Sequence, residues 1–271
     1  MIRLIASDID GTLVRDGQHG LPDEFFELIR ELRAQGTFFA AASGREINSM
    51  RRVFAPVADE IFFISSNGAL VTGPEGVIST KVMDPEKTRE LIADMHRLPD
   101  CCPYFTTADD NFTDSKDEKF IDWMVNGYLI DLKVVDDLLA EPHMFIKGAL
   151  HHPKVGVVAA ELIGKWKNTF YATLAGDMWV DFMHPSVGKG AALAELQQRL
   201  GVPAEETMAF GDHANDCGMF DAAYYSYAVA NASPEALAAA RFRTRSNVEG
   251  GVMEVMRRLA QTGEAPGDVT D

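Results

Sequence analysis

Short apolar runs alternate with amphipathic segments in the first part of the chain. Three runs have the length and composition of buried strands: residues 2–6, 37–42 and 61–64. After the first run, apolar residues recur at helical spacing from Pro22 onward, and Gly36 supplies the stop for that helix. A second helix is predicted between residues 47 and 53. This strict alternation predicts parallel strands joined by helices.

The alternation is interrupted in the middle of the chain. Residues 73–76 form a predicted hairpin turn, and the elements that follow keep no regular order. We expect helices at 85–97, 116–125 and 155–167 and strands at 103–107, 144–149, 169–172 and 178–183. We interpret residues 83–185 as an inserted domain, because strands and helices mixed in this way are typical of the α+β class.

The regular alternation of strands and helices returns after residue 186. We expect helices at 191–200, 217–222 and 252–259, another beginning at Pro234, and strands at 208–210 and 227–229. The tail from Thr262 is expected to be frayed. The predicted fold is therefore α/β, with a Rossmann-like parallel-sheet core built from residues 1–82 and 186–271 and an inserted α+β cap domain at 83–185.

The composition argues against several classes of protein. The chain has 271 residues, 46% of them hydrophobic, which suits one large or two modest globular domains. A formal net charge of −16 disfavours nucleic acid and anionic membranes as partners. No apolar stretch approaches the ~18 residues of a membrane span, and the start lacks the layout of a signal peptide. Because three cysteines make no disulfide framework, these features together predict a cytoplasmic protein.

Small polar and charged residues follow several predicted strands at the point where each strand ends. The set consists of Asp8 and Asp10 after the first strand, Ser43 after the second, Asn67 after the third, Lys189 at the start of a late helix, and Asp212, Asn215 and Asp216 after a late strand. Because the carboxyl ends of parallel strands meet at one edge of a sheet, these side chains are expected to converge there.

Three carboxylates at one sheet edge would repel one another unless a cation joined them. Hard oxygen ligands suit Mg²⁺, which also accepts substrate oxygens. A lysine, a hydroxyl and backbone N–H groups beside that ion would hold a phosphoryl group. One carboxylate can then attack phosphorus while a second protonates the leaving oxygen. An aspartate with the ordinary pKa of about 3.9 is ionised at pH 7, as a nucleophile must be.

An ordered set of motifs makes the chain resemble the haloacid-dehalogenase-like (HAD) superfamily, and within it the Cof-type, type IIB phosphatases. The motifs are Asp8-Ile9-Asp10-Gly11-Thr12-Leu13, Ser43-Gly44-Arg45, Lys189-Gly190 and Gly211-Asp212-His213-Ala214-Asn215-Asp216. Ser66-Asn67-Gly68-Ala69 and Asn231-Ala232 are also similar to that subfamily. The motifs cover the two ends of the chain, whereas the cap is matched by position and length.

The resemblance implies roles for the carboxylates. Asp8 would be the nucleophile that forms an aspartyl-phosphate, and Asp10 would act as general acid and then as general base. Mg²⁺ would be held by the Asp8 side chain, the Asp10 backbone carbonyl and Asp212. Asp216 would support the metal's water ligands or orient Lys189.

The resemblance also implies a group of residues that bind phosphate. Ser43, Gly44 and Lys189 would bind the phosphoryl oxygens, with help from Asn215. Asn67 is expected to support the site, and Arg45 to brace its loop rather than to contact substrate.

The predicted reaction is Mg²⁺-dependent hydrolysis of a phosphate monoester on a small molecule. Sugar phosphates are the class that the resemblance implies first, followed by nucleotide-like and cofactor phosphates. The cap would close over the catalytic edge, exclude water and select the substrate. Two alternatives stay open: phosphoryl transfer as in related sugar phosphomutases, and a catalytically retired fold that binds a phosphorylated metabolite. The oligomeric state, rate and substrate are not indicated by the sequence.

Overall fold

The computed structural model describes residues 1–14, 20–128, 130–141, 144–175 and 177–270. The chain divides into two compact units, a core unit and a cap unit. The core unit comprises Met1–Arg45, Met50–Ser79 and Gly188–Asp271. The cap unit comprises Thr80–Val187 together with Glu46–Ser49.

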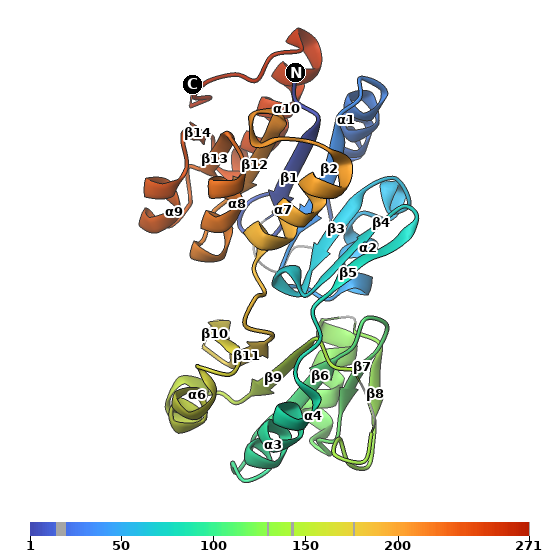
Figure 1. Ribbon diagram of the computed structural model, residues 1–271, viewed down its shortest axis with the longest axis vertical. Coiled ribbons are helices and arrows are strands. Elements are labelled where there is room, and N and C mark those ends of the chain that lie inside the picture. The colour runs from blue at the N-terminus through green and yellow to red at the C-terminus, as the bar shows by residue number, and fades with distance from the viewer. Residues whose placement is uncertain (15–19, 129, 142–143, 176, 271) are drawn as a thin grey trace. The chain divides into compact units, whose positions relative to one another are not determined.

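The core unit is built on a sheet of eight strands in the order β14-β13-β12-β1-β2-β3-β4-β5 (Figure 1). The strands are β1 (Leu4–Asp8), β2 (Phe38–Ala42), β3 (Phe62–Ser65), β4 (Leu70–Gly73), β5 (Gly76–Thr80), β12 (Thr207–Gly211), β13 (Tyr225–Val229) and β14 (Phe242–Thr244). β1 lies between β2 and β12 and is parallel to both. All five residues of β1 are buried, as expected for a central strand of a parallel sheet.

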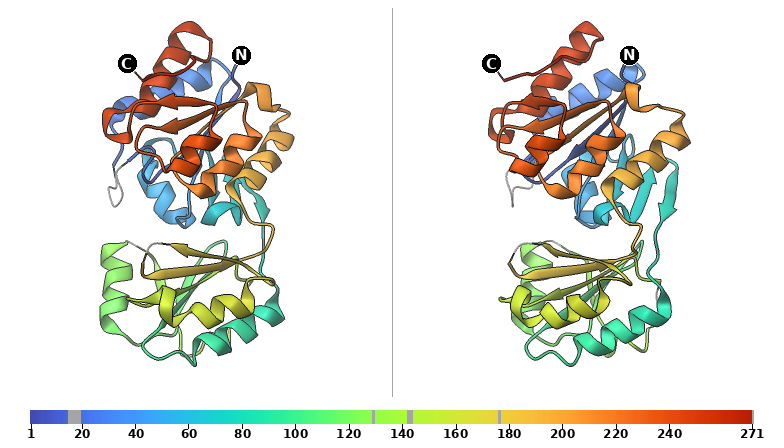
Figure 2. Two further views of the ribbon diagram at one scale, coloured as in Figure 1. Left: turned by 90° about the vertical axis from the view of Figure 1, so that its left-hand side faces the viewer. Right: turned by 60° about the vertical axis from the view of Figure 1, so that its left-hand side comes forward.

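Helices cover both faces of this sheet. They are α1 (Asp23–Ala34), α2 (Ile47–Val53), α7 (Lys189–Leu200), α8 (Cys217–Ala222), α9 (Pro234–Ala239) and α10 (Gly251–Thr262). α1 packs on α10 and α7 packs on α8, and the two pairs lie on opposite faces (Figures 1 and 2). Short 3-10 turns complete the unit: η1 (Ala55–Val57), η2 (Ser66–Gly68), η4 (Ala204–Glu206), η5 (Ala214–Asp216) and η6 (Asn247–Glu249). This doubly covered sheet confirms the predicted α/β class.

The cap unit contains a separate sheet in the order β10-β11-β9-β6-β7-β8. Its strands are β6 (Cys102–Thr106), β7 (Asn111–Thr113), β8 (Leu132–Val134), β9 (Lys147–His151), β10 (Tyr171–Ala175) and β11 (Trp179–Met183). Its helices are α3 (Pro85–Met95), α4 (Glu118–Asp122), the π-helix η3 (Trp123–Gly127), α5 (Val155–Val158) and α6 (Ala160–Trp166). β7 and β8 form a parallel pair, whereas the other pairings in this sheet are antiparallel.

The two faces of the cap sheet are packed differently. α3, α5 and α6 cover one face, where Phe105, Leu150 and Phe182 belong to a large apolar cluster (Figure 2). The other face contributes Tyr104 and Ala149 to a smaller cluster with residues of α4 and the π-helix. Because side chains alternate along a strand, every second residue of β6, β9 and β11 therefore lies on the second face.

Several elements differ from the expectations. The strand expected at 144–149 is β9 (Lys147–His151), and the helix expected at 155–167 is interrupted at Ala159, whose ψ is 6°. Three short strands, β7, β8 and β14, were not foreseen, because three residues carry too little periodicity to be recognised.

The expectation of a frayed tail after Thr262 is wrong for the described residues. Val269 is 1% exposed and forms a parallel bridge with Thr244 of β14. Its backbone N–H donates to Arg243, and its carbonyl accepts from Arg245. The segment therefore adds a short extension to the edge of the core sheet.

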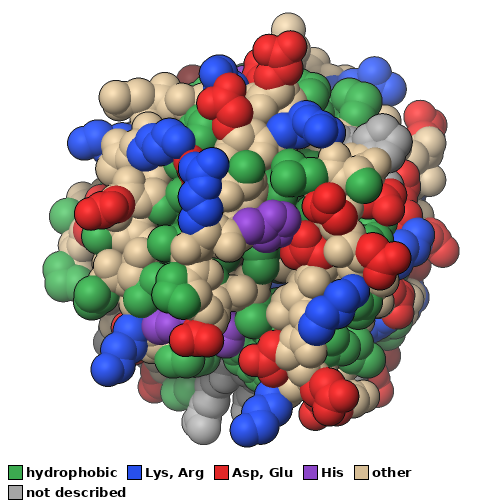
Figure 3. Space-filling view, turned by 90° about the horizontal axis from the view of Figure 1, so that it is seen from below, with side chains coloured by type: hydrophobic (Ala, Val, Ile, Leu, Met, Phe, Trp, Pro, Cys, Tyr) green, Lys and Arg blue, Asp and Glu red, His purple; other side chains and the backbone are tan. Residues whose placement is uncertain are grey.

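The surface carries charges of both signs. On the face drawn in Figure 3, acidic side chains are interspersed with Lys and Arg and gather along one side. That distribution agrees with the formal net charge of −16. Within the part of the chain that the structure describes, no helix combines the length and the apolar character needed to cross a membrane.

Candidate active site

The candidate site lies in the core unit, at the carboxyl ends of its central strands. β1 ends at Asp8, and its neighbours β2 and β12 lead directly into Ser43 and Asp212. Asp8, Ser43 and Asp212 are all buried, with at most 5% of each residue exposed. Open α/β sheets bind their ligands at this edge, so the fold brings these polar groups to the expected place.

Lys189 connects two of the carboxylates. Its Nζ atom lies 2.5 Å from Asp8 Oδ1 and 2.7 Å from Asp216 Oδ1. The Lys189 side chain is 1% exposed, so both ion pairs are shielded from water. Lys189 is the first residue of α7, which packs closely on α8. Only glycine fits at position 190 in this crossing, because a Cβ atom there would lie 2.3 Å from the Gly218 backbone. Small residues at the helix crossing thus allow the ammonium group to reach the sheet edge.

The loop after β12 orients Asp212 and Asp216. Asp216 Oδ2 accepts hydrogen bonds from the backbone N–H groups of Asp212 (3.0 Å) and His213 (3.1 Å). Asp212 accepts a hydrogen bond from the Thr12 hydroxyl at 2.9 Å, and its other oxygen lies 2.6 Å from His213 Nδ1. The His213 side chain is 69% exposed, so it extends outward from this loop.

Gly11 keeps the turn after β1 close to Asp212. Its φ is +82°, a left-handed conformation that glycine adopts without strain. A Cβ atom there would lie 2.4 Å from Asp212 Oδ2. The Gly11 carbonyl also accepts a hydrogen bond from Asn231 Nδ2 at 2.8 Å, which fixes the turn. Glycine is therefore required both by the backbone conformation and by the nearby carboxylate.

Burial and charge shift the pKa values of the central pair. Burial raises the pKa of Asp8 well above its ordinary value, and the carboxylates of Asp216 and Asp212 act in the same direction against the lowering effect of Lys189. Burial lowers the pKa of Lys189, but Asp216 and Asp8 outweigh it and raise that pKa overall. The surroundings of Asp8 thus differ from those of an ordinary solvated aspartate, and a further positive charge beside it would act with Lys189 to lower its pKa.

The donor set fits a divalent cation. Oxygen atoms of Asp8, Asp212 and Asp216 lie within 4.8 Å of one another, and all three residues are buried. Lys189 supplies one positive charge against these three carboxylates, which leaves an excess of negative charge in a buried position. Carboxylate oxygens without sulfur or imidazole ligands in this group are the donors that Mg²⁺ prefers.

Asp10, the second carboxylate after β1, forms an ion pair with Arg45. The guanidinium group donates from Nε to Asp10 Oδ2 at 2.8 Å and from Nη2 to Oδ1 at 2.5 Å. A two-pronged pair of this kind fixes the orientation of the carboxylate as well as its charge. We expected Arg45 to brace its own loop; its contact with Asp10 was not foreseen, because no spacing in the sequence indicates it.

The predicted phosphate-binding residues are also brought together. Asn215 Nδ2 donates to Asn67 Oδ1 at 3.2 Å, and a Cβ atom at Gly44 would lie 3.2 Å from Asn67 Nδ2. The Asn67 N–H donates to the Ser43 carbonyl at 2.9 Å. Ser66 and Asn67 have φ values of 47° and 55°. Consecutive left-handed residues other than glycine store backbone strain, which is common at functional sites.

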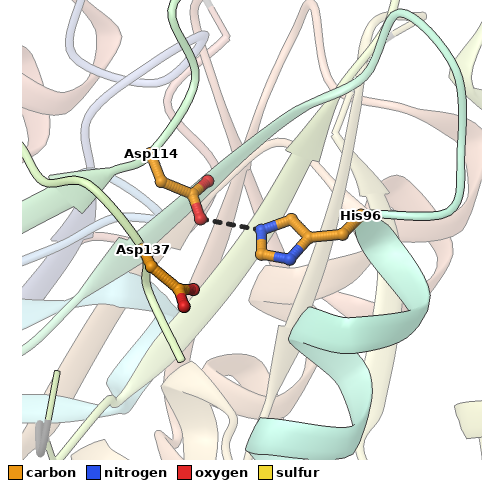
Figure 4. A group of neighbouring side chains, drawn as sticks. All are labelled: His96, Asp114 and Asp137. Atoms are coloured by element: carbon orange, nitrogen blue, oxygen red, sulfur yellow. Dashed lines mark hydrogen bonds and ion pairs between the residues drawn. The ribbon is translucent and has the colours of Figure 1, made fainter. Parts of the chain in front are cut away.

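A second group that could hold a metal lies in the cap unit and was not predicted (Figure 4). His96 Nε2 lies 2.7 Å from Asp114 Oδ2, which also accepts from the Leu138 N–H. Asp137 accepts from the Leu139 N–H at 2.8 Å. These hydrogen bonds join the end of α3 to two loops, so a structural role accounts for the group without any ligand.

The family follows from comparison with known proteins. Residues 5–256 match the family of haloacid dehalogenase-like hydrolases. The chain belongs to this family. The predicted membership of the HAD superfamily is thus confirmed, and the relatives described next, which are named as phosphatases, support the predicted enzyme class, a hydrolase of phosphate monoesters.

Individual relatives match over nearly the whole chain. A 5-amino-6-(5-phospho-D-ribitylamino)uracil phosphatase of Escherichia coli (strain K12) is 27% identical over 272 residues, covering 98% of this chain and 99% of the relative. An HMP-PP phosphatase of Cronobacter sakazakii is 29% identical over 245 residues, 88% of each chain. A crystal structure from Eubacterium rectale superposes with a TM-score of 0.89 at 32% identity, covering 95% of this chain and 99% of that one.

Proposed function

We propose that this hydrolase removes phosphate from small-molecule monoesters, sugar phosphates above all, in a Mg²⁺-dependent reaction through an aspartyl-phosphate on Asp8. The observation that carries the proposal is the buried Lys189 ammonium group between Asp8 and Asp216, with Asp212 beside them. A buried carboxylate at a ligand-binding sheet edge, next to a fixed cation, suits nucleophilic attack on a phosphoryl group.

In the first half-reaction, an oxygen of Asp8 attacks phosphorus and the ester P–O bond breaks. Asp10 gives its proton to the leaving alcohol oxygen. The Lys189 ammonium group contacts Asp8 and so positions the nucleophile. It is also proposed to stabilise the negative charge on the phosphoryl oxygens. Ser43, Gly44 and Asn215 are proposed to bind the remaining phosphoryl oxygens.

In the second half-reaction, water attacks phosphorus, the bond to Asp8 breaks and Asp10 accepts the proton of the water. The pair with Arg45 suits this step, because the guanidinium group donates to both carboxylate oxygens of Asp10 and so fixes the orientation of the group that accepts the proton. Arg45 is therefore proposed as a positioning residue for Asp10 rather than as a substrate ligand.

Mg²⁺ is proposed to be held by the side chains of Asp8 and Asp212 and by the Asp10 backbone carbonyl, with Asp216 supporting it. When bound, the ion supplies positive charge that offsets the carboxylates and the phosphoryl oxygens. The excess of buried negative charge described above supports its presence.

Among candidate substrates, 5-amino-6-(5-phospho-D-ribitylamino)uracil is a specific ester to test alongside sugar phosphates. The E. coli relative that aligns with 98% of this chain is named for that compound. Its ribityl chain is a phosphorylated polyol, so it belongs to the same chemical class as the sugar phosphates. The HMP-PP of the Cronobacter relative is a second specific compound.

The test measures phosphate release from a panel of sugar phosphates, 5-amino-6-(5-phospho-D-ribitylamino)uracil and HMP-PP, with and without Mg²⁺, for the wild-type enzyme and Asp8→Asn. We expect turnover only by the wild type in Mg²⁺, and a loss of at least ~10⁴-fold in kcat for Asp8→Asn, because removal of a covalent nucleophile typically costs this much or more. Asp59→Asn is a matched control, since the Asp59 side chain is 89% exposed. It should keep wild-type activity.

Three results would contradict the proposal, each in a different way. Turnover that is unaffected by chelation of divalent ions would exclude the proposed requirement for Mg²⁺. Tight binding of an ester without release of phosphate would indicate a retired enzyme that senses a metabolite. Transfer of phosphate between two hydroxyl groups of one substrate, in place of hydrolysis, would indicate a mutase.

A further inference from the structure

The segment that follows β1 carries Asp10 and is closed by its own backbone. The Gly11 N–H donates to the Val14 carbonyl at 2.8 Å, and the Val14 N–H donates to the Ile9 carbonyl at 3.0 Å. Asp10 and Val14 also form an isolated parallel bridge. The backbone of Asp10 is therefore tied to this short segment, residues 9–14, which we call the Asp10 turn.

Two asparagines from the last part of the chain bind the Asp10 turn. Asn231 Nδ2 donates to the Gly11 carbonyl at 2.8 Å, and Asn247 Nδ2 donates to the Val14 carbonyl at 3.1 Å. The asparagines are also joined to each other, because the Asn247 N–H donates to Asn231 Oδ1 at 2.9 Å. A connected pair of residues, 220 and 233 positions away in the sequence, thus holds the turn at two of its carbonyls.

The loops that carry the two asparagines are themselves fixed. Asn231 lies in the turn between β13 and α9, where the Ser233 N–H donates to the Asp212 carbonyl at 2.8 Å. Asn247 is the first residue of η6, whose start is closed by a reciprocal capping box of side chains. Through these loops, the outer strands β13 and β14 act on the segment that follows the central strand β1.

Asp10 is consequently held at two places. Arg45 binds its carboxylate through two hydrogen bonds, and the asparagine pair binds the backbone directly after it. A general acid must lie within hydrogen-bond distance of the oxygen that it protonates. Because a displacement of about 1 Å can cost ~10²-fold in rate, the backbone that carries such a group has to be fixed as well as its side chain.

Stability alone gives little reason for this arrangement. Asn231 is exposed and Asn247 is half-buried, so their hydrogen bonds compete with bonds to water. The net contribution of a neutral hydrogen bond to folding is small even in the interior of a protein. What the pair does provide is a defined position for a turn that carries a catalytic carboxylate.

We propose that Asn231 and Asn247 are positioning residues for Asp10, which hold this carboxyl group where it can protonate the leaving oxygen. The inference rests on the proposed function, because it presupposes that Asp10 transfers this proton. It gives a role to Asn231, which belongs to one of the motifs of the family resemblance, and to Asn247, which lies outside all of them.

The test uses two esters that differ in their need for a proton at the leaving oxygen. p-Nitrophenolate is a stable anion and leaves without a proton, whereas the alkoxide of a sugar requires one. The value of kcat/KM reports the first half-reaction, in which the proton is given. It is measured at saturating Mg²⁺ for the full-length enzyme, with p-nitrophenyl phosphate and with the sugar phosphate that the wild type hydrolyses best.

Asn231→Ala and Asn247→Ala are expected to act on one ester far more than on the other. On the sugar phosphate, kcat/KM should fall roughly ten- to a hundredfold, since a well-placed general acid contributes ~10²–10⁴-fold. On p-nitrophenyl phosphate it should fall by no more than about threefold, because little acid catalysis can be lost there. The double variant should lose little more than either single variant, since the two residues act as one connected unit.

Gln35→Ala is a matched control in the same unit. Gln35 Nε2 also donates to a distant backbone carbonyl, that of Ala260, at 3.1 Å in an exposed position. Gln35 precedes β2, so it lies at the edge of the sheet opposite the candidate site. This variant should keep the wild-type kcat/KM on both esters. All three single variants should melt within about 4 °C of the wild type, the range expected for the loss of one or two exposed hydrogen bonds.

The outcomes separate the inference from the proposed function. A wild-type enzyme that releases phosphate from neither ester contradicts the proposed function itself. If the wild type is active but the asparagine variants lose activity equally on the two esters, or lose none on the sugar phosphate, the positioning role is overturned and the proposed function stands. Losses that multiply in the double variant would likewise overturn the joint action of the pair.

Discussion

Each unit of the protein holds a buried lysine paired with aspartate, but the two clusters are balanced differently. In the core unit, Lys189 faces Asp8 and Asp216, with Asp212 within reach of both carboxylates. In the cap unit, Lys147 pairs with Asp181, and its Nζ atom lies 2.7 Å from Asp181 Oδ2. The first cluster has one cation for three carboxylates, whereas the second is neutral overall.

The difference in balance indicates a difference in the need for a cation. A cluster with excess buried negative charge is stabilised by a cation, and the raised pKa of Asp8, caused first by burial and then by its acidic neighbours, reflects that need. A neutral cluster gains nothing from an ion and offers only hydrogen bonds. The same two residue types thus leave an excess of negative charge in one unit and form a balanced ion pair in the other.

Substituting the core lysine is expected to have the largest effect on stability. Lys189→Met leaves the carboxylates of Asp8 and Asp216 buried without their partner, which should cost about 3–5 kcal/mol of unfolding free energy. The control Lys165→Met removes an ion pair to Asp94 whose lysine is 55% exposed, and should cost no more than about 1 kcal/mol. Urea denaturation measures both, and Mg²⁺ should restore part of the loss in Lys189→Met. If both variants lost the same unfolding free energy, the buried charges of the core cluster would contribute no more to stability than an exposed ion pair.

Crowding the carboxylates should affect activity more than stability. Gly11→Ala places a Cβ atom 2.4 Å from Asp212 Oδ2 and should lower kcat roughly a hundredfold, the effect of moving a catalytic group by about 1 Å. Gly36→Ala is matched in backbone strain, since its φ is +91°, but nothing lies within 4 Å of its Cβ. Steady-state kinetics on one ester decide the matter: comparable activity of the two alanine variants would show that Asp212 tolerates displacement.

The smallest expected effect is a change in how the melting temperature depends on pH, and it arises from a histidine of the cap unit. Burial lowers the pKa of His151, which lies among the rings of Phe120, Trp123 and Trp179. Since the unfolded chain then binds the proton more readily, the contribution of His151 to stability is present above its unfolded pKa, about 6.5, and is lost as the pH falls through the lower folded value. The melting temperature of His151→Gln should therefore fall less than that of the wild type between pH 7.5 and 5.5.

A control and a contrary result complete that prediction. His184→Gln replaces a histidine outside this ring cluster and should keep the wild-type dependence on pH. If His151→Gln follows the wild-type curve, the aromatic surroundings of His151 do not contribute to the response to acid.

The core and its site were predictable because each signal is local. Each of the central strands β1, β2, β3 and β12 is an apolar run that ends in, or is followed directly by, a small polar residue, and parallel strands bring those ends together. Gly11 and Gly190 stand next to Asp10 and Lys189 in the same short motifs, so the tight approaches they allow accompany the residues that use them.

The cap was less predictable because its contacts depend on register between distant strands. Lys147 and Asp181 are brought together only by the antiparallel pairing of β9 with β11, and no local pattern specifies which residues face each other. The contact of Arg45 with Asp10 is similar, since it depends on the path of two loops. β7 and β8 have three residues each, too few to show the alternation of a strand.

The bridge between Val269 and Thr244 also bears on self-association. β14 is the outermost strand on its side of the core sheet, and an uncovered outer strand offers free N–H and C=O groups to the strands of other molecules. Val269 occupies part of that edge, and the Tyr227 hydroxyl and the Arg243 N–H hold the same segment through Pro266 and Asp268. A chain that ends before residue 264 would keep every group of the candidate active site. Its β14 edge would be uncovered, and we expect its molecules to aggregate through this edge as their concentration rises.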